Sequence, residues 1–190
     1  WEEANTDYSI TGLRQIRPPL RILDQVGVRP GQTLLAIGAS GGVGSAVLQI
    51  ARDRGITVIG TAGAANQDYL RSLGALATTY EEGRAERVRR LGHVDAALDL
   101  AGSGVIGELV ELTGDPHKVV SIADPHAPKL GAHFSNLAGS MPRALARTVD
   151  LIDRGRLHIP VAKSYTLADA SAAHIDSQAG HTRGRRVILA

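Results

Sequence analysis

Four glycines fall within seven residues in the segment GASGGVG, residues 38–44. They follow a short apolar run, 33–38, and precede a segment with the apolar spacing of a helix, 43–54. A helix N-terminus presents unpaired N–H groups and a partial positive charge. A phosphate can approach these groups only where no Cβ stands in the way. The segment could therefore bind a phosphate or a pyrophosphate.

The spacing fits the pattern G-x-G-x-x-G, with Ala39 in the first place, Gly41 in the second and Gly44 in the third. We interpret Gly41 as the residue that lets a pyrophosphate approach, and Gly44 as the residue that lets the helix pack close to the strand. A strand before the pattern, and a helix and a second strand after it, are the context of dinucleotide-binding sites. A glycine-rich turn without a ligand is the alternative.

The end of the second predicted strand bears on which nicotinamide cofactor would bind. Sites for NAD carry an Asp or Glu about 20 residues after the glycines, where it binds the ribose 2′-OH. Here Thr61, Ala62 and Gly63 occupy that place, and none is acidic. A 2′-phosphate would meet no repulsion there, so we expect NADPH in preference to NADH. We expect no Lys or Arg nearby to bind the phosphate, so this preference rests on the absence of a carboxylate alone.

Strands and helices alternate along the chain. The apolar patterns predict strands at 33–38, 56–60, 76–80, 95–100, 117–123, 185–190 and, more weakly, 132–134, and helices at 11–26, 43–54, 66–74, 84–92, 106–112, 142–155 and 167–180. Pro18 and Pro19 should break or kink the first helix. The alternation predicts an α/β fold, a Rossmann-type doubly wound parallel six-stranded sheet with helices on both faces.

Composition excludes several other kinds of site. The chain has 190 residues, no cysteine and a formal net charge of +2. Disulfides, thiolate zinc sites and cysteine nucleophiles are thereby excluded, and the scattered histidines predict no metal site. We expect the Arg-rich run 84–90 to be the solvated face of a helix rather than a nucleic-acid surface. No apolar run approaches the ~18 residues of a membrane helix and no secretory leader is present, so we expect a cytoplasmic protein.

The sequence offers few candidates for a catalytic nucleophile or for an acid–base pair. Ser40 and Ser45 lie outside any G-x-S-x-G pattern, so we expect them to bond phosphate or cap the helix. No tyrosine is followed by a lysine four residues on, which excludes the catalytic pair of short-chain dehydrogenases. Asp95 and Asp99 flank a predicted strand, and we expect polar strand ends rather than an acid and a base. No residue is assigned a catalytic role.

Several segments together resemble the cofactor domain of the medium-chain dehydrogenase/reductase superfamily, most closely its zinc-independent quinone oxidoreductase and enoyl reductase branch. These segments are 28–63, LRSLGA (70–75), DAALDLAG (95–102), KVVSIAD (118–124) and GHTRGRRVILA (180–190). The resemblance implies NADPH-dependent reduction of quinones, or of enones and enoyl thioesters, by hydride transfer to a small electrophile. It also implies a sheet that often pairs edge to edge in a homodimer. Because the sequence carries no nucleic-acid or membrane signal, we expect neither a nucleic-acid nor a membrane partner.

The resemblance also implies where a cofactor would touch this chain. The pyrophosphate would lie on Ala39, Ser40, Gly41, Gly42, Val43 and Gly44, and the adenosine end on Thr61, Ala62, Gly63 and Tyr80. The nicotinamide side would be lined by Leu100, Ala101, Gly102, Ser121, Ile122, Ala123 and Phe134. Family members commonly carry a lysine where this chain has Asn66, and that difference counts against NADPH.

In the family, a GroES-like substrate domain of over a hundred residues precedes the cofactor domain. We expect residues 1–27 to be a polar segment and linking helix, 28–160 to be the Rossmann domain, and 161–190 to be a tail that in the family packs on the substrate domain. The chain is then expected to be the cofactor-binding half of a longer reductase. A nucleotide-binding or redox-sensing module without catalysis is the alternative.

Overall fold

The computed structural model describes residues 17–135, 142–179, 183 and 185–189. Six strands form one sheet in the order β3-β2-β1-β4-β5-β6, and all neighbours in it are parallel. The strands are β1 (Thr33–Ile37), β2 (Thr57–Thr61), β3 (Leu76–Thr78), β4 (Ala96–Asp99), β5 (Val119–Ser121) and β6 (His133–Phe134). This is the strand order of a Rossmann fold, and the predicted fold class is confirmed.

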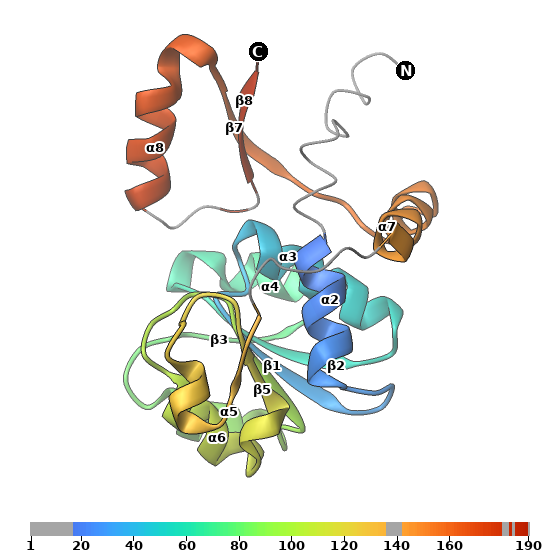
Figure 1. Cartoon of the computed structure of the whole chain (residues 1–190), viewed down its shortest axis with the longest axis vertical. Helices are drawn as coiled ribbons and strands as arrows, with labels where there is room; N and C mark the ends of the chain where they lie inside the picture. The colour runs from blue at the N-terminus through green and yellow to red at the C-terminus, as the bar shows by residue number, and fades with distance from the viewer. Residues whose placement is uncertain (1–16, 136–141, 180–182, 184, 190) are drawn as a thin grey trace.

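Helices connect the strands and cover both faces of the sheet. They are α2 (Arg17–Val26), α3 (Gly42–Asp53), α4 (Gln67–Ser72), α5 (Arg84–Leu91), α6 (Ile106–Thr113), α7 (Pro142–Asp153) and α8 (Ala170–Ala179). Figure 1 shows α2, α3 and α4 on one side of the sheet and α5 and α6 on the other. The carboxyl ends of all six strands therefore lie along one edge of a covered sheet, where ligands bind in folds of this kind.

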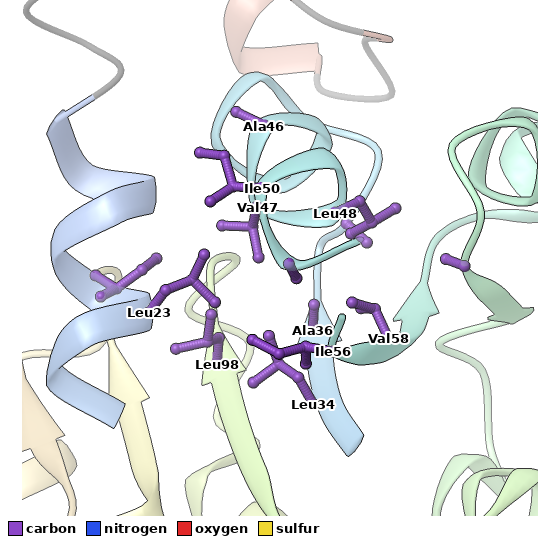
Figure 2. Packing of buried hydrophobic residues seen from close by; sticks show 14 of the residues in the cluster. Leu23, Leu34, Ala36, Ala46, Val47, Leu48, Ile50, Ile56, Val58 and Leu98 are labelled. Carbon is purple, nitrogen blue, oxygen red and sulfur yellow. The ribbon is translucent and has the colours of Figure 1, made fainter. Parts of the chain in front are cut away.

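Alternate residues of the central strand β1 pack on opposite faces. Leu34 and Ala36 belong to the cluster beneath α2 and α3, whereas Leu35 and Ile37 belong to the cluster beneath α5 and α6. Figure 2 shows the first cluster, in which Val47 of α3 lies above the strands. Burial on both faces explains why the strand reads as a continuous apolar run rather than an alternating one.

The two prolines of α2 do not break it, contrary to the expectation from the sequence. Pro18 and Pro19 lie in the first turn of α2, which begins at Arg17. The N–H groups of a first turn have no partner within the helix, so prolines there remove no hydrogen bond. The helical prediction for residues 11–16 lies outside the described part of the chain.

A second, two-stranded sheet was not foreseen. Strand β7 (Val161–Thr166) pairs in parallel with β8 (Arg185–Leu189), and Figure 1 shows both apart from the main sheet. The sequence predicts a strand near β8 but none at β7. Lys163 and Tyr165 of β7 both donate to the carboxylate of Asp176 in α8, the Lys163 Nζ at 2.9 Å. The bond from Tyr165 is the larger cause of a lowered pKa of Asp176, and the bond to Asp176 raises the pKa of Lys163.

Gly44 is the position where the fold tolerates a side chain least. A Cβ there would stand 2.6 Å from the backbone of Ala39 and Gly38. We expect Gly44→Ala to lower the free energy of unfolding by about 3 kcal/mol or more, because backbone must move to admit the methyl group. Chemical denaturation measures the change.

The matched control is Gly107→Ala in α6, where a Cβ would meet nothing within 4 Å. It should leave stability at or slightly above that of the unmodified chain, because alanine is the better helix former. Equal stability of the two variants would contradict the importance of the close contact at Gly44.

Candidate functional site

The glycine segment forms the turn that carries β1 into α3. Gly38 adopts φ +78°, a left-handed conformation that glycine accepts readily. Gly41 is the N-cap of α3, and its carbonyl accepts from the Ser45 N–H at 2.8 Å. The close approach expected at Gly44 is present. Gly41 differs, because its φ is an ordinary −71° and a Cβ there would meet only the Gly38 carbonyl at 3.7 Å. Nothing in the described chain requires a glycine at 41, and a side chain there would meet no close neighbour.

A cavity of about 550 Å³ opens beside this turn, at the carboxyl ends of β1, β2, β3 and β4. This volume is typical of small-molecule sites. It is lined by Ile37, Gly38, Ser40, Ala62, Gly63, Asn66, Tyr80, Arg84, Ala101, Ser103, Gly104, Val105 and Glu108. Five of the residues predicted to contact a cofactor are thereby brought together, namely Ser40, Ala62, Gly63, Tyr80 and Ala101. Tyr80 is 47% exposed and its hydroxyl lies next to Gly63.

Two other predicted contact residues are buried beneath the turn rather than in the cavity lining. The Thr61 hydroxyl accepts from the Gly38 N–H at 3.3 Å, and the Thr61 carbonyl accepts from the Ala39 N–H at 2.9 Å. Both Thr61 and Ala39 are fully buried. They hold the glycine turn against the end of β2. Gly41, Gly42, Val43 and Gly44 lie at the start of α3, adjoining the lining residue Ser40.

The residues predicted for the nicotinamide side lie at the ends of the next strands. Leu100, Ala101 and Gly102 follow β4, Ser121 ends β5 with Ile122 and Ala123 after it, and Phe134 is in β6. Of these, only Ala101 lines the cavity. The residues predicted from the sequence therefore fall in two adjoining regions of one sheet edge. The cavity lies in the region predicted for the pyrophosphate and the adenosine, not in the one predicted for the nicotinamide.

Asp99 links the ends of β4 and β5. The sequence did not single it out for this role. Its carboxylate is fully buried and accepts from the Ser121 hydroxyl at 2.7 Å and from the Gly102 N–H at 2.9 Å. The Ser121 oxygen in turn accepts from the N–H groups of Ala123 and Asp124. One carboxylate and one hydroxyl thus fix both loops at this edge.

Asp95 and Asp99 do not form an acid–base pair. They flank opposite ends of β4, and Asp95 accepts from the backbone N–H of Thr33 at 2.8 Å. The expectation that both are polar strand ends is confirmed.

The Arg-rich run 84–90 corrects one expectation from the sequence. Arg89 and Arg90 are exposed as expected, but the side chain of Arg84 is only 11% exposed. Arg84 binds Glu108 through two parallel hydrogen bonds, Nε to Oε1 at 2.8 Å and Nη2 to Oε2 at 2.9 Å. The pairing partner is 24 residues away on α6, so spacing within the run could not reveal it. Both residues line the cavity.

Arg183 corrects the expectation that no cation is near the end of β2. Its guanidinium donates to the Asn66 amide oxygen at 2.6 Å and to the Ala65 carbonyl. It also lies 6.0 Å from the centre of the Tyr69 ring. Burial raises the pKa of the Tyr69 hydroxyl, and the nearby Arg183 charge opposes that rise. Asn66 lines the cavity, so a cation from the C-terminal segment stands at its border.

The described residues contain neither a metal cluster nor a membrane-spanning helix. Within residues 17–135, 142–179, 183 and 185–189, no three His, Asp or Glu side chains are grouped so that they could hold a metal ion. In the same ranges, no helix has both the length and the apolar character to cross a bilayer.

Comparisons with known proteins agree with this architecture. The sequence profile of a family described as zinc-binding dehydrogenase matches residues 73–188. The pikromycin polyketide synthase component PikAII of Streptomyces venezuelae is 33% identical over 184 residues, 84% of this chain and 5% of that protein. The quinone oxidoreductase structure from Coxiella burnetii superposes with a TM-score of 0.80 at 26% identity, over 97% of this chain and 59% of that one.

A mycobacterial protein, solved as a complex with NADPH, superposes with a TM-score of 0.77 at 25% identity over 94% of this chain. The chain spans 62% of that protein. It therefore covers less than two thirds of the length of each relative described here.

The bond between Asp99 and Ser121 should contribute to the stability of the fold. Ser121→Ala removes the hydroxyl that donates to Asp99 and accepts from two N–H groups, so we expect a loss of about 2–3 kcal/mol in the free energy of unfolding. Denaturation of the variant measures this. Ser72→Ala is the control, since that exposed hydroxyl bonds only the Tyr69 carbonyl of its own helix and its removal should change stability by less than about 0.5 kcal/mol. An equally small effect at Ser121 would contradict the role of the pair.

Proposed function

The chain belongs to the medium-chain dehydrogenase/reductase superfamily of oxidoreductases, and we propose that it is the cofactor-binding part of an NADPH-dependent reductase. The electron acceptor we propose is an activated C=C or C=O bond, as in a quinone, an enone or an enoyl thioester. Similarity to quinone oxidoreductases and to a polyketide synthase supports this range of acceptors.

One observation carries the proposal of a dinucleotide. Gly41 has neither a left-handed backbone nor a close neighbour, yet it stands directly at the N-terminus of α3. A pyrophosphate bound in front of that N-terminus would explain why residue 41 is a glycine, because a Cβ there would occupy the space of the pyrophosphate. The adjoining cavity has room for the adenosine half.

The preference for NADPH rests on charge at the end of β2. Thr61, Ala62 and Gly63 bring no carboxylate to the place where a ribose 2′-substituent would lie. Arg183 stands beside Asn66 at the same end of the cavity. A guanidinium there can donate to a 2′-phosphate. It would serve in place of the lysine that is common in the family at position 66.

A nicotinamide cofactor would supply the hydride, and the residues of this chain would hold it in place. The N–H groups at the start of α3 bind the pyrophosphate, while Gly63 and Tyr80 border the adenosine ribose. Asp99 and Ser121 fix the loops after β4 and β5, which would flank the nicotinamide. The chain contributes binding and orientation, and no side chain of it is required to donate a proton.

Two further parts of the proposal concern where the electron acceptor binds and how copies of the chain assemble. We propose that β7, α8 and β8 pack on a substrate-binding part of the whole protein, because Leu167, Ile175 and Leu189 are more than half exposed there. We also propose that the β6 edge of the main sheet pairs with a second copy.

The competing function is nucleotide binding without catalysis. Oxidation of NADPH by the whole protein with a quinone or an enone would distinguish a reductase from such a binding module.

Calorimetric titration of the chain with NADPH tests the proposal, and Gly41→Ala sharpens it. The unmodified chain should bind NADPH, and the variant should bind at least about ten-fold more weakly, a loss of about 1.4 kcal/mol, because its methyl group displaces the pyrophosphate. The folded state should lose no more than about 1 kcal/mol, the usual cost of replacing glycine by alanine at an N-cap. Absence of NADPH binding by the unmodified chain, or undiminished binding by the variant, would contradict the proposal.

Arg183→Ala tests the origin of the cofactor preference. We expect NADPH binding to weaken by about ten-fold or more, since a hydrogen bond to a charged group contributes about 1.5–3 kcal/mol. NADH binding should change little, because NADH lacks the 2′-phosphate. Arg89→Ala, which removes an exposed arginine of α5, is the control for net charge. Parallel losses of NADPH and NADH affinity would argue against a role in reading the phosphate.

A further inference from the structure

We propose that the Arg84–Glu108 pair reads the base of the bound dinucleotide and selects adenine through its 6-amino group. This inference rests on the proposed function and adds to it a specificity-determining pair. Arg84 and Glu108 are the two ionisable residues of opposite charge among the residues that line the described cavity, and they come from the first turns of two different helices, α5 and α6.

The position of the base follows from the positions of the other groups. The pyrophosphate is assigned to the start of α3, and the ribose to the border formed by Gly63 and Tyr80. The lining residues away from both of these places include Ser103, Gly104 and Val105 after β4, together with Arg84 and Glu108. Figure 1 shows α5 and α6 on the side of the sheet opposite α3. The base must therefore lie toward the pair.

The pair is rigid, because its two charged groups are joined at two points. The Arg84 Nε and Nη2 each donate to one oxygen of the Glu108 carboxylate, at 2.8 and 2.9 Å. The exposed fractions of the two side chains are 11% and 31%, which leaves the carboxylate the more accessible of the two. A two-point bond between a guanidinium and a carboxylate fixes both orientation and distance.

The unused bonding capacity of the pair complements adenine. A carboxylate accepts about four hydrogen bonds and a guanidinium donates five. Arg84 and Glu108 each use two of these on one another, so Glu108 keeps free lone pairs and Arg84 keeps N–H groups beside them. Adenine carries an amino donor at C6 and an acceptor at N1 and N7. Hypoxanthine carries a carbonyl oxygen at C6 and an N–H at N1. In the orientation of adenine it would set its C6 oxygen against the carboxylate and its N1–H against a guanidinium N–H.

The test is a comparison of NADPH with its hypoxanthine analogue, in which a carbonyl oxygen replaces the 6-amino group. Calorimetry of the full chain should show the analogue binding about ten-fold or more weakly, in the range of a two-point base contact. In Glu108→Ala this ratio should fall close to one. Glu111→Ala is the matched control, because Glu111 is an exposed acid on the same helix and is absent from the cavity lining, and the ratio should persist there.

Each outcome separates the inference from the proposed function. If NADPH and its analogue bind equally to the unmodified chain, the pair does not read the base, although the dinucleotide proposal stands; this comparison needs no variant to fold. A ratio that survives in Glu108→Ala also overturns the inference, since it leaves the pair with only a structural role between α5 and α6. Failure of both nucleotides to bind overturns the proposed function and the inference with it.

Discussion

The contact between the first turn of α3 and the backbone before it determines where everything else at the site lies. At Gly44 the helix comes so close to Ala39 and Gly38 that only a hydrogen atom fits between them. This closeness aims the helix N-terminus at the carboxyl edge of the sheet, because α3 cannot move away from β1 without losing the buried packing of Val47 and Ile50. The open space at Gly41, the bonds that Thr61 accepts from Gly38 and Ala39, and the cavity beside β2 all adjoin that contact.

Local patterns were sufficient to predict the main sheet and the glycine turn. The apolar run of β1 and the glycines at 38–44 are patterns of neighbouring residues, so they can be recognised in the sequence although the contacts that bury them come from several elements. Three features that the sequence did not reveal are long-range. Arg84 meets Glu108 across 24 residues, and Arg183 meets Asn66 across 117. Strand β7 pairs with β8, which lies more than 15 residues further along the chain, and its own pattern of exposed and buried residues is irregular.

The same distinction explains why some predicted site residues lie beneath the cavity rather than in its lining. Matching a pattern places Thr61 and Ser121 at the ends of strands but does not say which way their side chains point. In the structure both are buried and bond the backbone or Asp99, so their contribution is to fix loops. The cavity lining is instead supplied in part by α5 and α6, which no glycine pattern marks.

Arg183 connects the C-terminal segment to the cavity beside the six-stranded sheet. The sheet and its covering helices end with α7, and the segment from β7 onward looks like a separate piece in Figure 1. Yet Arg183, just before β8, reaches back to the backbone and side chain at the start of α4. The unit that folds around the six-stranded sheet is therefore smaller than the unit that surrounds its cavity. A cut between Ile159 and β7 would keep both core clusters of the sheet while changing the electrostatic surroundings of the cavity.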